Sequence, residues 1–350
     1  MIEVSAGVIG PEGGDILVCR RAEGQRHAHL WEFPGGKRES GEDAETCLRR
    51  ELREELELAI GPARVLTELE AEGIRFTFLA AEPLGEPVAR EHEAVRFVKP
   101  GELLRLPFCP ADAPMAAALA LRRISPDAFL WDFDGTLADT YPLMTEALCR
   151  SVRQAGAALE MTEALDLMKV SLGHALRTLS ARFGLPLEAL AQAYRAEEKA
   201  LTPGALPLFP GAGRVLRSLQ AAGGRHFLLT HRDLESVRAL EAAGLRDCFT
   251  GFVTAEDGFP RKPDPTGCRA LLERWGINPA RAVMIGDRPL DVEAGRAAGT
   301  LGCLLDPEHR FDGAEADLRA GSLEELPALL TGAWPGSAPE DSPPHNRLIT

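Results

Sequence analysis

Residues 30–60, "LWEFPGGKRESGEDAETCLRRELREELELAI", contain two adjacent glycines followed by a segment rich in carboxylates. Glu51, Glu54 and Glu55 are spaced i, i+3 and i+4, so a helix places them on one face, where like charges repel. An exposed helix of an acidic protein can carry such a face simply because it is solvated. The crowding instead favours a bound cation, and oxygen ligands without Cys or His suit Mg²⁺ or Mn²⁺ better than Zn²⁺.

The spacing of the charged residues resembles the Nudix hydrolase signature, G-x5-E-x7-R-E-U-x-E-E-x-G-U, in which U is a bulky aliphatic residue. The matching residues are Gly36, Glu42, Arg50, Glu51, Leu52, Glu54, Glu55 and Leu58. Glu57 stands where the family has glycine, at a helix end that commonly needs a left-handed residue. We therefore expect a strain of roughly 1 kcal/mol at Glu57 or a shifted helix terminus.

The resemblance implies a metal site and catalytic residues in this half of the chain. Glycines let the backbone come close to a metal or a phosphate, which suits the "FPGG" stretch before the helix. Glu54 and Arg50 are expected to be catalytic. The implied Mg²⁺ ligands are Glu51, Glu54, Glu55, Glu91 and the carbonyl of Gly35.

Residues 3–123 resemble the MutT-type branch, whose members remove oxidised purine triphosphates such as 8-oxo-dGTP. The resemblance implies that Phe33 packs near the base and that Arg21 meets the phosphates. Asp112, in "FCPADAPM", falls where an Asn or Asp of the branch reads the purine edge. A carboxylate accepts hydrogen bonds but donates one only when protonated, so the oxidised-base preference stays open at this point.

Length and charge bound the number of domains and the class of partner. The chain has 350 residues, enough for two domains with separate hydrophobic cores. Its net charge of −14 divides into −6 before residue 126 and −8 from there on, so neither half has the basic surface of a nucleic-acid-binding domain. We expect small-molecule nucleotides and a phosphomonoester as partners, and no nucleic-acid polymer. The oligomeric state stays open.

Cysteine usage and hydropathy indicate the compartment. The seven cysteines are scattered, odd in number and never spaced C-x-x-C, which is typical of reduced thiols rather than of disulfides or a zinc site. The sequence shows no signal peptide and no apolar run long enough to span a bilayer. We therefore expect a cytoplasmic protein without membrane contact.

A domain boundary is expected near "LRRISPDAFLWDFDGT", residues 121–136. Before it, short strand-like runs surround the acidic helix. After it, buried strands alternate with helices, a pattern typical of a parallel sheet with crossover helices. We place the first domain at residues 1–125, the second at 126–332 and a Pro/Ser-rich disordered tail at 333–350. The expected fold class is α/β and α+β in two domains, an α/β/α sandwich with a mixed sheet and then a Rossmann-like parallel-sheet core.

The second half opens with "LWDFDGTLADT", in which an apolar run ends at Asp132-x-Asp134. At the end of a strand this pair lies where open α/β sheets place their sites, although "DFDG" alone also suits a strand-to-turn junction. Further along, Thr230 ends an apolar strand and Lys262 precedes a proline in "FPRKPDP". "VMIGDRPLDVEAG" then ends a third strand with two more aspartates, Asp287 and Asp291. In order and spacing these residues resemble the four motifs of the haloacid dehalogenase-like phosphohydrolases.

That resemblance assigns a role to each residue type. Asp132 would attack phosphorus to form an aspartyl-phosphate, while Asp134 would protonate the leaving oxygen and later activate water. Asp287 would complete a Mg²⁺ site with the Asp132 carboxylate and the Asp134 backbone carbonyl. Lys262 would offset charge on the phosphoryl group, and Thr230 would donate a hydrogen bond to it. Asp291 is either a metal-site residue or an acceptor for the lysine.

The stretch at about 141–207 has helical periodicity without strands and resembles the helical cap of these phosphatases. Caps exclude water and select the substrate. The sequence as a whole predicts a bifunctional hydrolase that cleaves a nucleoside triphosphate to its monophosphate and then a phosphomonoester, which would be that same product if the reactions are linked. Two alternatives stay open. In the first, the phosphatase acts independently on phosphoglycolate or pyrophosphate. In the second, the chain is a regulatory nucleotide-binding protein that has lost catalysis.

Overall fold

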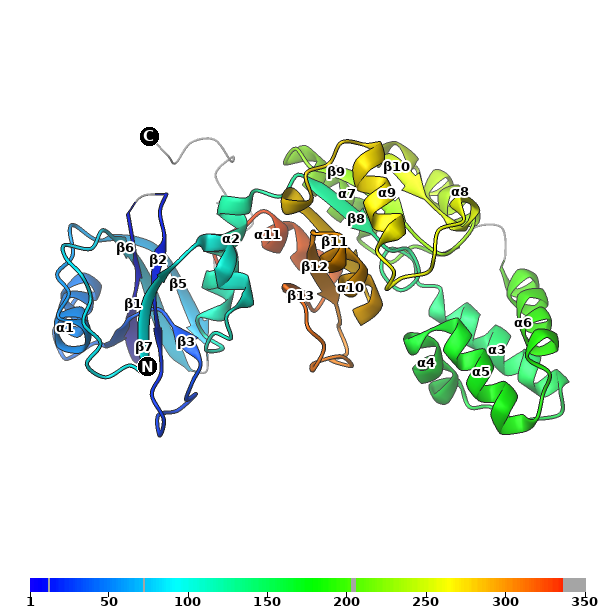
Figure 1. The fold of residues 1–350 in the computed structure, drawn as a ribbon, viewed down its shortest axis with the longest axis horizontal. Helices are drawn as coiled ribbons and strands as arrows, with labels where there is room; N and C mark the ends of the chain where they lie inside the picture. Colours follow the sequence, from blue (N-terminus) through cyan, green and yellow to red (C-terminus); the bar gives the residue numbers. More distant parts are fainter. Residues whose placement is uncertain (12, 72, 203–205, 336–350) are drawn as a thin grey trace. The chain divides into compact units, whose positions relative to one another are not determined.

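The structure is a computed structural model that describes all residues except 12, 72, 203–205 and 336–350. It divides the chain into two compact units. The first contains residues 1–125 and returns at Leu326, and the second contains residues 126–325. Each unit has its own sheets and helices, which Figure 1 labels. The predicted fold class, with a mixed sheet in the first unit and a parallel sheet in the second, is confirmed.

The first unit contains two sheets. In the larger sheet β1 pairs parallel with β6 and antiparallel with β4, so that this sheet is mixed. Its strand order is β4 (Gly35–Lys37), β1 (Ile2–Ile9), β6 (Ile74–Ala81) and β5 (Arg64–Ala71). The smaller sheet is antiparallel, with the order β3 (Trp31–Glu32), β2 (Ile16–Arg20) and β7 (Ala94–Val98).

Helix α1 (Ala44–Leu56) carries the acidic signature. It begins at Asp43, whose side chain accepts a hydrogen bond from the Thr46 backbone N–H, the usual way to satisfy a free donor at a helix start. It ends at Glu57, which has φ 51° and ψ 24°. Of the two outcomes expected at Glu57, the structure therefore shows the left-handed residue rather than a shifted terminus. The buried residues of α1 are Cys47, Leu48, Leu52 and Leu56.

The C-terminal segment belongs to the first unit, which differs from the predicted boundary at 332. Helix α11 (Leu326–Leu330) packs against α2 (Ala113–Ile124), which follows the short 3₁₀ helix Pro100–Arg105. Beyond it, the indole of Trp334 lies 4.0 Å under the Arg122 guanidinium and packs on the same core as α2. Residues 333–335 are thus ordered by an aromatic anchor, and the predicted disordered tail from 336 on lies outside the described residues.

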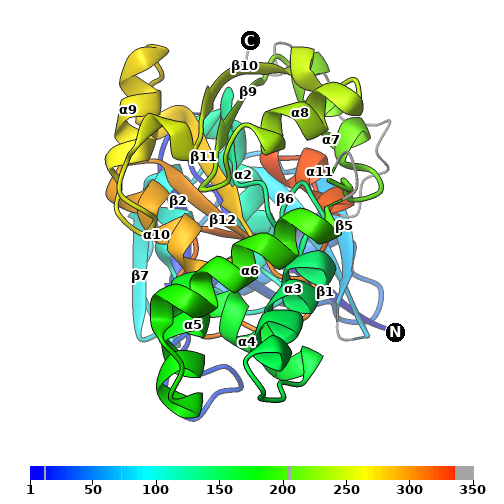
Figure 2. The same cartoon turned by 90° about the vertical axis from the view of Figure 1, so that its right-hand side faces the viewer.

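The second unit is built on six parallel strands, and Figure 2 shows α9 and α10 on one face of this sheet and α7 and α8 on the other. The strand order is β10 (Phe249–Val253), β9 (Arg225–Leu229), β8 (Ala128–Trp131), β11 (Ala282–Gly286), β12 (Leu301–Leu305) and β13 (Leu318–Ala320). The helices are α7 (Ala212–Ala221), α8 (Glu235–Ala242), α9 (Thr266–Arg274) and α10 (Pro289–Ala297). Strand order reverses beside β8, so the carboxyl ends of β8, β9 and β11 form the edge where such sheets bind ligands.

Between β8 and α7, the described residues form a bundle of four helices and contain no strand. They are α3 (Tyr141–Gln154), α4 (Met161–Val170), α5 (Leu172–Phe183) and α6 (Leu187–Leu201). The bundle has a hydrophobic cluster of its own, which includes Leu148, Met168 and Tyr194. Among the described residues, no helix is both long and apolar enough to cross a membrane.

Candidate active sites

Three aspartates of the second unit meet at the carboxyl edge of the parallel sheet. Asp132 follows β8, Asp287 follows β11, and Asp291 lies in the first turn of α10. One ligand oxygen from each lies within 4.8 Å of the others, and all three residues are buried. Oδ2 of Asp132 has no hydrogen-bond partner among the described residues. A divalent cation suits this set, because hard oxygen ligands bind Mg²⁺ and the ion would compensate buried negative charge.

Lys262 supplies positive charge among these aspartates. Its ammonium donates to Asp132 Oδ1 at 2.6 Å and to the Leu229 carbonyl at 3.1 Å, and it lies 2.5 Å from Asp291 Oδ1. Burial alone would raise the pKa of Asp132, but the charges of Lys262 and Arg288 outweigh burial and hold this pKa below its ordinary value. Asp132 is therefore ionised, as a nucleophile must be. Burial and the charge of Asp132 raise the pKa of Asp291 to about 6.

Asp134 has a different environment from Asp132. Burial raises the pKa of its carboxyl, and Arg232 opposes this rise by donating from Nε to Asp134 Oδ1 at 2.8 Å. Glu198 of the cap helix α6 accepts a second hydrogen bond from the same guanidinium at 3.1 Å. Two carboxyls two positions apart thus have opposite tendencies. One is ionised and the other is inclined to hold a proton, a division that suits nucleophilic attack followed by proton donation.

Thr230 and Gly135 complete the shape of this edge. The Thr230 hydroxyl is buried and accepts a hydrogen bond from the Arg232 backbone N–H at 3.1 Å, so its own proton is available to another acceptor. Gly135 has φ 78°, and a Cβ there would lie 2.5 Å from Asp287 Oδ2 and 2.3 Å from the Tyr141 ring. Only glycine lets the backbone approach the Asp287 carboxylate so closely.

Arg50 is the centre of the acidic cluster in the first unit. It donates two hydrogen bonds to Glu42, at 2.8 and 3.0 Å, and one each to Glu51 at 2.9 Å and Glu54 at 3.2 Å. The bond from Arg50 lowers the pKa of Glu42 to about 2. A further bond to the Lys37 carbonyl at 3.0 Å ties the helix to β4. The repulsion expected on the acidic face is thus partly offset by an arginine of the same helix.

The two glycines before the helix are needed for close packing. A Cβ on Gly36 would lie 2.3 to 2.6 Å from the carboxyl atoms of Glu51. Gly35 has φ 147°, and a Cβ there would lie 2.0 Å from the Ser5 carbonyl oxygen on the neighbouring strand. The backbone of β4 therefore lies directly against Glu51 of α1 and against β1. The close approach of these glycines to a metal or a phosphate stays a prediction.

Glu55 is the partly buried glutamate at the C-terminal end of the acidic face of α1. Its Oε2 is buried and has no hydrogen-bond partner among the described residues. Burial raises its pKa to about 7, and His92, whose Nε2 lies 4.0 Å away, opposes that rise. Such an orphaned oxygen suits a bound cation. By contrast, Glu54 and Glu91 are exposed, and within the described residues the three-aspartate group of the second unit is the only cluster whose oxygens converge within 4.8 Å.

Family comparisons assign both units. The family described as "NUDIX domain" matches residues 1–119, and that described as "haloacid dehalogenase-like hydrolase" matches residues 126–299. The chain belongs to both hydrolase families. The two resemblances drawn from the motifs are therefore confirmed. Nudix and haloacid dehalogenase-like hydrolases generally use divalent metal ions such as Mg²⁺ and act on small nucleotide or phosphate substrates.

Three relatives illustrate the range of activities in these families. CTP pyrophosphohydrolase of Escherichia coli is 40% identical over 133 residues, which cover 36% of this chain and 97% of that protein. The 8-oxo-dGTP diphosphatase of Haemophilus influenzae is 37% identical over 120 residues, or 33% of this chain and 88% of the relative. Phosphoglycolate phosphatase of Rhodospirillum rubrum is 33% identical over 189 residues, or 50% of this chain and 77% of the relative.

The residues expected to bind substrate in the Nudix unit do not all face open space. Phe33 is buried, stacked on Phe108 at 5.4 Å between ring centroids. Its backbone N–H donates to Asp112 Oδ1 at 3.2 Å, so Phe33 and Asp112 lie together. Arg21 instead pairs with Glu32 at 2.5 Å and donates to the Arg26 carbonyl at 2.6 Å. Phosphate binding by Arg21 would require it to share or leave these partners.

Three cationic residues of the phosphatase site were missed by sequence reasoning. Arg288 lies 3.6 Å from Asp132 and 3.8 Å from Asp287, and Lys169 of the cap helix α4 donates to Asp287 at 2.8 Å. Arg232 binds Asp134. Arg288 and Arg232 lie next to or near motif residues, so charge beside a motif was an available signal. Lys169 is far from every motif, and only the fold brings it to the site.

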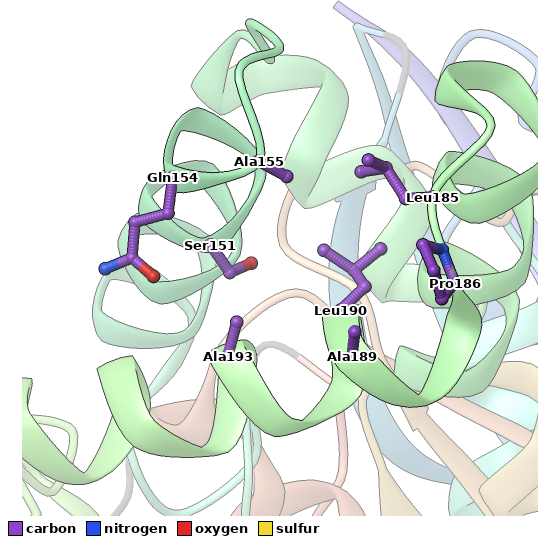
Figure 3. Close-up of a pocket in the computed structure, with 8 residues that line it drawn as sticks. All are labelled: Ser151, Gln154, Ala155, Leu185, Pro186, Ala189, Leu190 and Ala193. Carbon is purple, nitrogen blue, oxygen red and sulfur yellow. The ribbon is translucent and has the colours of Figure 1, made fainter.

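Figure 3 shows an apolar pocket of about 210 Å³ on the cap, between α3 and α6. Its walls carry no charged side chain that could form an ion pair with a phosphate. The lining residues are Ser151, Gln154, Ala155, Leu185, Pro186, Ala189, Leu190 and Ala193.

Proposed function

We propose that the two units hydrolyse successive phosphate bonds of one nucleotide. The Nudix unit cleaves an oxidised purine nucleoside triphosphate, such as 8-oxo-dGTP, between the α and β phosphates and releases the monophosphate and pyrophosphate. The phosphatase unit then converts the monophosphate to nucleoside and phosphate. The observation that carries the phosphatase step is the buried, ionised Asp132, 2.6 Å from Lys262 and two positions from a carboxyl that burial inclines to hold a proton.

The phosphatase reaction takes place in two steps. An oxygen of Asp132 forms a bond to phosphorus while the bond from phosphorus to the ester oxygen breaks, and Asp134 gives its proton to that oxygen. Water then attacks the aspartyl-phosphate and gives a proton to Asp134. The bond between phosphorus and Asp132 breaks, which releases phosphate and restores both carboxyls. Throughout, Lys262 offsets negative charge and Thr230 donates a hydrogen bond to the phosphoryl group.

The three-aspartate cluster supports the proposed metal site of the phosphatase unit, and the motif resemblance supports that of the Nudix unit. Asp132, Asp287 and the Asp134 carbonyl would hold Mg²⁺, with Asp291 beside it, and the ion would neutralise charge on the phosphoryl group. In the Nudix unit, bound Mg²⁺ would activate water and neutralise the phosphates. Arg50 fixes the orientation of two of the Nudix glutamates, as described above. The proposed Nudix ligands are Glu51, Glu54, Glu55, Glu91 and the Gly35 carbonyl.

Asp112 supports the choice of an oxidised purine. Burial raises its pKa to about 7, with the hydrogen bond from the Phe33 backbone N–H opposing the rise. Near neutral pH a large fraction of Asp112 is therefore protonated and able to donate a hydrogen bond, which a carboxylate cannot do. A protonated Asp112 would offer the hydrogen-bond donor that an Asn offers at a position that reads the base.

CTP is a second candidate for the Nudix unit, because the chain shares 40% identity with a CTP pyrophosphohydrolase. For the phosphatase unit, phosphoglycolate is the alternative suggested by its relative of that name. Pyrophosphate is a third substrate that would leave the two reactions unlinked. The chain keeps a carboxylate at every motif position that needs one, which argues against a regulatory protein that has lost catalysis.

One product assay separates these functions. The purified full chain is incubated with Mg²⁺ and, in separate reactions, 8-oxo-dGTP, dGTP, CTP, 8-oxo-dGMP, phosphoglycolate and pyrophosphate, and the products are resolved by chromatography. We expect a higher kcat/KM for 8-oxo-dGTP than for dGTP or CTP, and nucleoside as the final product. Equal turnover of 8-oxo-dGTP and dGTP would rule out selection of the oxidised base. Failure to cleave 8-oxo-dGMP would rule out the sequential pathway.

A further inference from the structure

We propose that Lys169 of the cap competes with the metal ion for Asp287, so that metal binding and cap attachment are linked in the phosphatase unit. The inference rests on the proposed function, because it takes Asp287 as a Mg²⁺ ligand. It adds a cap residue that lies outside every motif.

Lys169 is firmly placed against the site. Its Nζ donates to Asp287 Oδ2 at 2.8 Å and lies 4.2 Å from the centre of the Tyr141 ring. The Lys169 side chain is 19% exposed and that of Asp287 is 2% exposed, so water screens the pair poorly. The other oxygen of Asp287 accepts a hydrogen bond from Thr136 at 3.4 Å. Both oxygens of the proposed metal ligand are thus engaged by the protein.

If Lys169 stays 2.8 Å from Asp287, a metal ion bound to the same carboxylate is repelled by the ammonium charge. An ammonium has only donors, so it cannot act as a ligand, and its charge repels a divalent cation at close range. Binding of Mg²⁺ to Asp287 therefore weakens or breaks the contact with Lys169. By linkage, the contact weakens Mg²⁺ binding by the same factor.

The other cations near the three aspartates belong to the core and not to the cap. Lys262 contacts Asp132 and Asp291. Arg288, at the start of α10, lies 3.8 Å from Asp287. Lys169 comes from α4, which also reaches the core through Asp166 and Arg310, at 2.6 Å. When Lys169 is released, α4 keeps this second ion pair, so metal binding loosens the cap at one point without detaching it.

The first experiment measures Mg²⁺ binding to the full chain by calorimetry, without substrate. Asp287→Asn removes the proposed phosphatase ligand, so the difference between its isotherm and that of the unmodified chain isolates the phosphatase site from the Nudix sites. We expect Lys169→Met to bind Mg²⁺ at this site about three- to tenfold more tightly, as an ion pair of this kind contributes modest free energy. The matched control is Lys199→Met, which removes an exposed lysine of the neighbouring cap helix and should leave the affinity unchanged.

The second experiment measures the chemical reactivity of the Lys169 amine directly. The chain has five lysines, Lys37, Lys99, Lys169, Lys199 and Lys262, so reductive methylation followed by peptide mass spectrometry resolves each of them. We expect Lys169 to react slowly without metal and at least about threefold faster with saturating Mg²⁺, relative to Lys199, because release from Asp287 exposes its amine. In Asp287→Asn, Lys169 should react fast with or without Mg²⁺.

The outcomes separate this inference from the proposed function. If the unmodified chain and Asp287→Asn give the same Mg²⁺ isotherm, the proposed metal site itself is wrong. If the site binds Mg²⁺ but Lys169→Met does not tighten it, or Lys169 reactivity does not respond to Mg²⁺, the competition is wrong while the metal site stands.

Discussion

Arg232 donates a hydrogen bond to Asp134 at 2.8 Å in a buried part of the phosphatase site, and it binds Glu198 of the cap with its other side. This relationship leads to a prediction about the general acid. Arg232→Met should lower turnover of an alkyl phosphate by about tenfold or more, because Asp134 loses the partner that orients it. Turnover of p-nitrophenyl phosphate should fall much less, since its leaving group departs without a proton.

The control for Arg232 is Arg238→Met, which removes an exposed arginine of α8. This variant should leave the turnover of both esters unchanged. An equal loss on the two esters in Arg232→Met would mean that the arginine acts on folding or binding, and not through the acid.

Glu54→Gln tests the Nudix metal site. The variant removes a proposed charged ligand but keeps its shape, and the side chain is 59% exposed, so the fold should be retained. Pyrophosphate release from the triphosphate should fall by about 10² or more, while phosphomonoester hydrolysis is unchanged. Glu45→Gln, on the same helix, is the control. Normal pyrophosphate release by Glu54→Gln would remove this residue from the metal site.

Asp132→Asn tests whether the two reactions follow one another. Without the nucleophile no aspartyl-phosphate forms, and the Nudix glutamates are untouched. Given 8-oxo-dGTP, this variant should release pyrophosphate normally and accumulate 8-oxo-dGMP, while the unmodified chain goes on to the nucleoside. The measurement is a time course by chromatography. An unmodified chain that also stops at the monophosphate would show that the cap admits another substrate.

Asp112 predicts a pH dependence of stability. Its pKa is raised to about 7 in the folded chain, against about 3.9 in an unfolded one. The folded state therefore binds more protons between about pH 4 and pH 7, and stability falls as pH rises through that window. Asp112→Asn keeps an acceptor for the Phe33 N–H without a charge. The measurement is urea unfolding at pH 5 and at pH 8. Between these pH values, the free energy of unfolding should fall by on the order of 2 to 4 kcal/mol more in the unmodified chain than in this variant. If the free energy of unfolding fell equally in the two proteins, Asp112 would be ionised at both pH values.

Glu57→Gly should stabilise the Nudix unit. Glu57 has φ 51°, a left-handed conformation in which glycine is about 1 kcal/mol more favourable. The variant also loses the ion pair with Arg90, but both side chains are about half exposed and such pairs contribute little. We expect a net gain of about 0.5 to 1 kcal/mol in urea unfolding. Glu57→Ala, which loses the same ion pair but keeps a Cβ, should show no gain.

The sequence predicted those parts of the fold that depend on local sequence patterns. Alternating apolar runs predicted the parallel sheet, and motif spacing predicted that Asp132, Asp287 and Lys262 would meet. These predictions succeed because the carboxyl ends of parallel strands meet at one edge whatever the loops do.

Other features depend on contacts between distant segments, and no local pattern encodes them. Lys169 reaches Asp287 across 118 positions, and Arg232 reaches Asp134 across 98. The elevated pKa of Asp112 arises from burial, which a spacing does not specify. Trp334 falls in the tail whose Pro/Ser-rich composition predicts disorder, and its packing against Arg122 outweighs that composition.

The return of the C-terminal segment to the first unit changes the order in which the protein can be assembled. During synthesis, residues 126–325 leave the ribosome before α11 and Trp334 do, so the Nudix core cannot be completed until the phosphatase has been made. Two covalent connections join the units, one near residue 125 and the other near residue 326. A protease that cuts near residue 125 divides the chain into residues 1–125 and 126–350, and the two fragments then stay together only while α11 and Trp334 remain packed on the Nudix core.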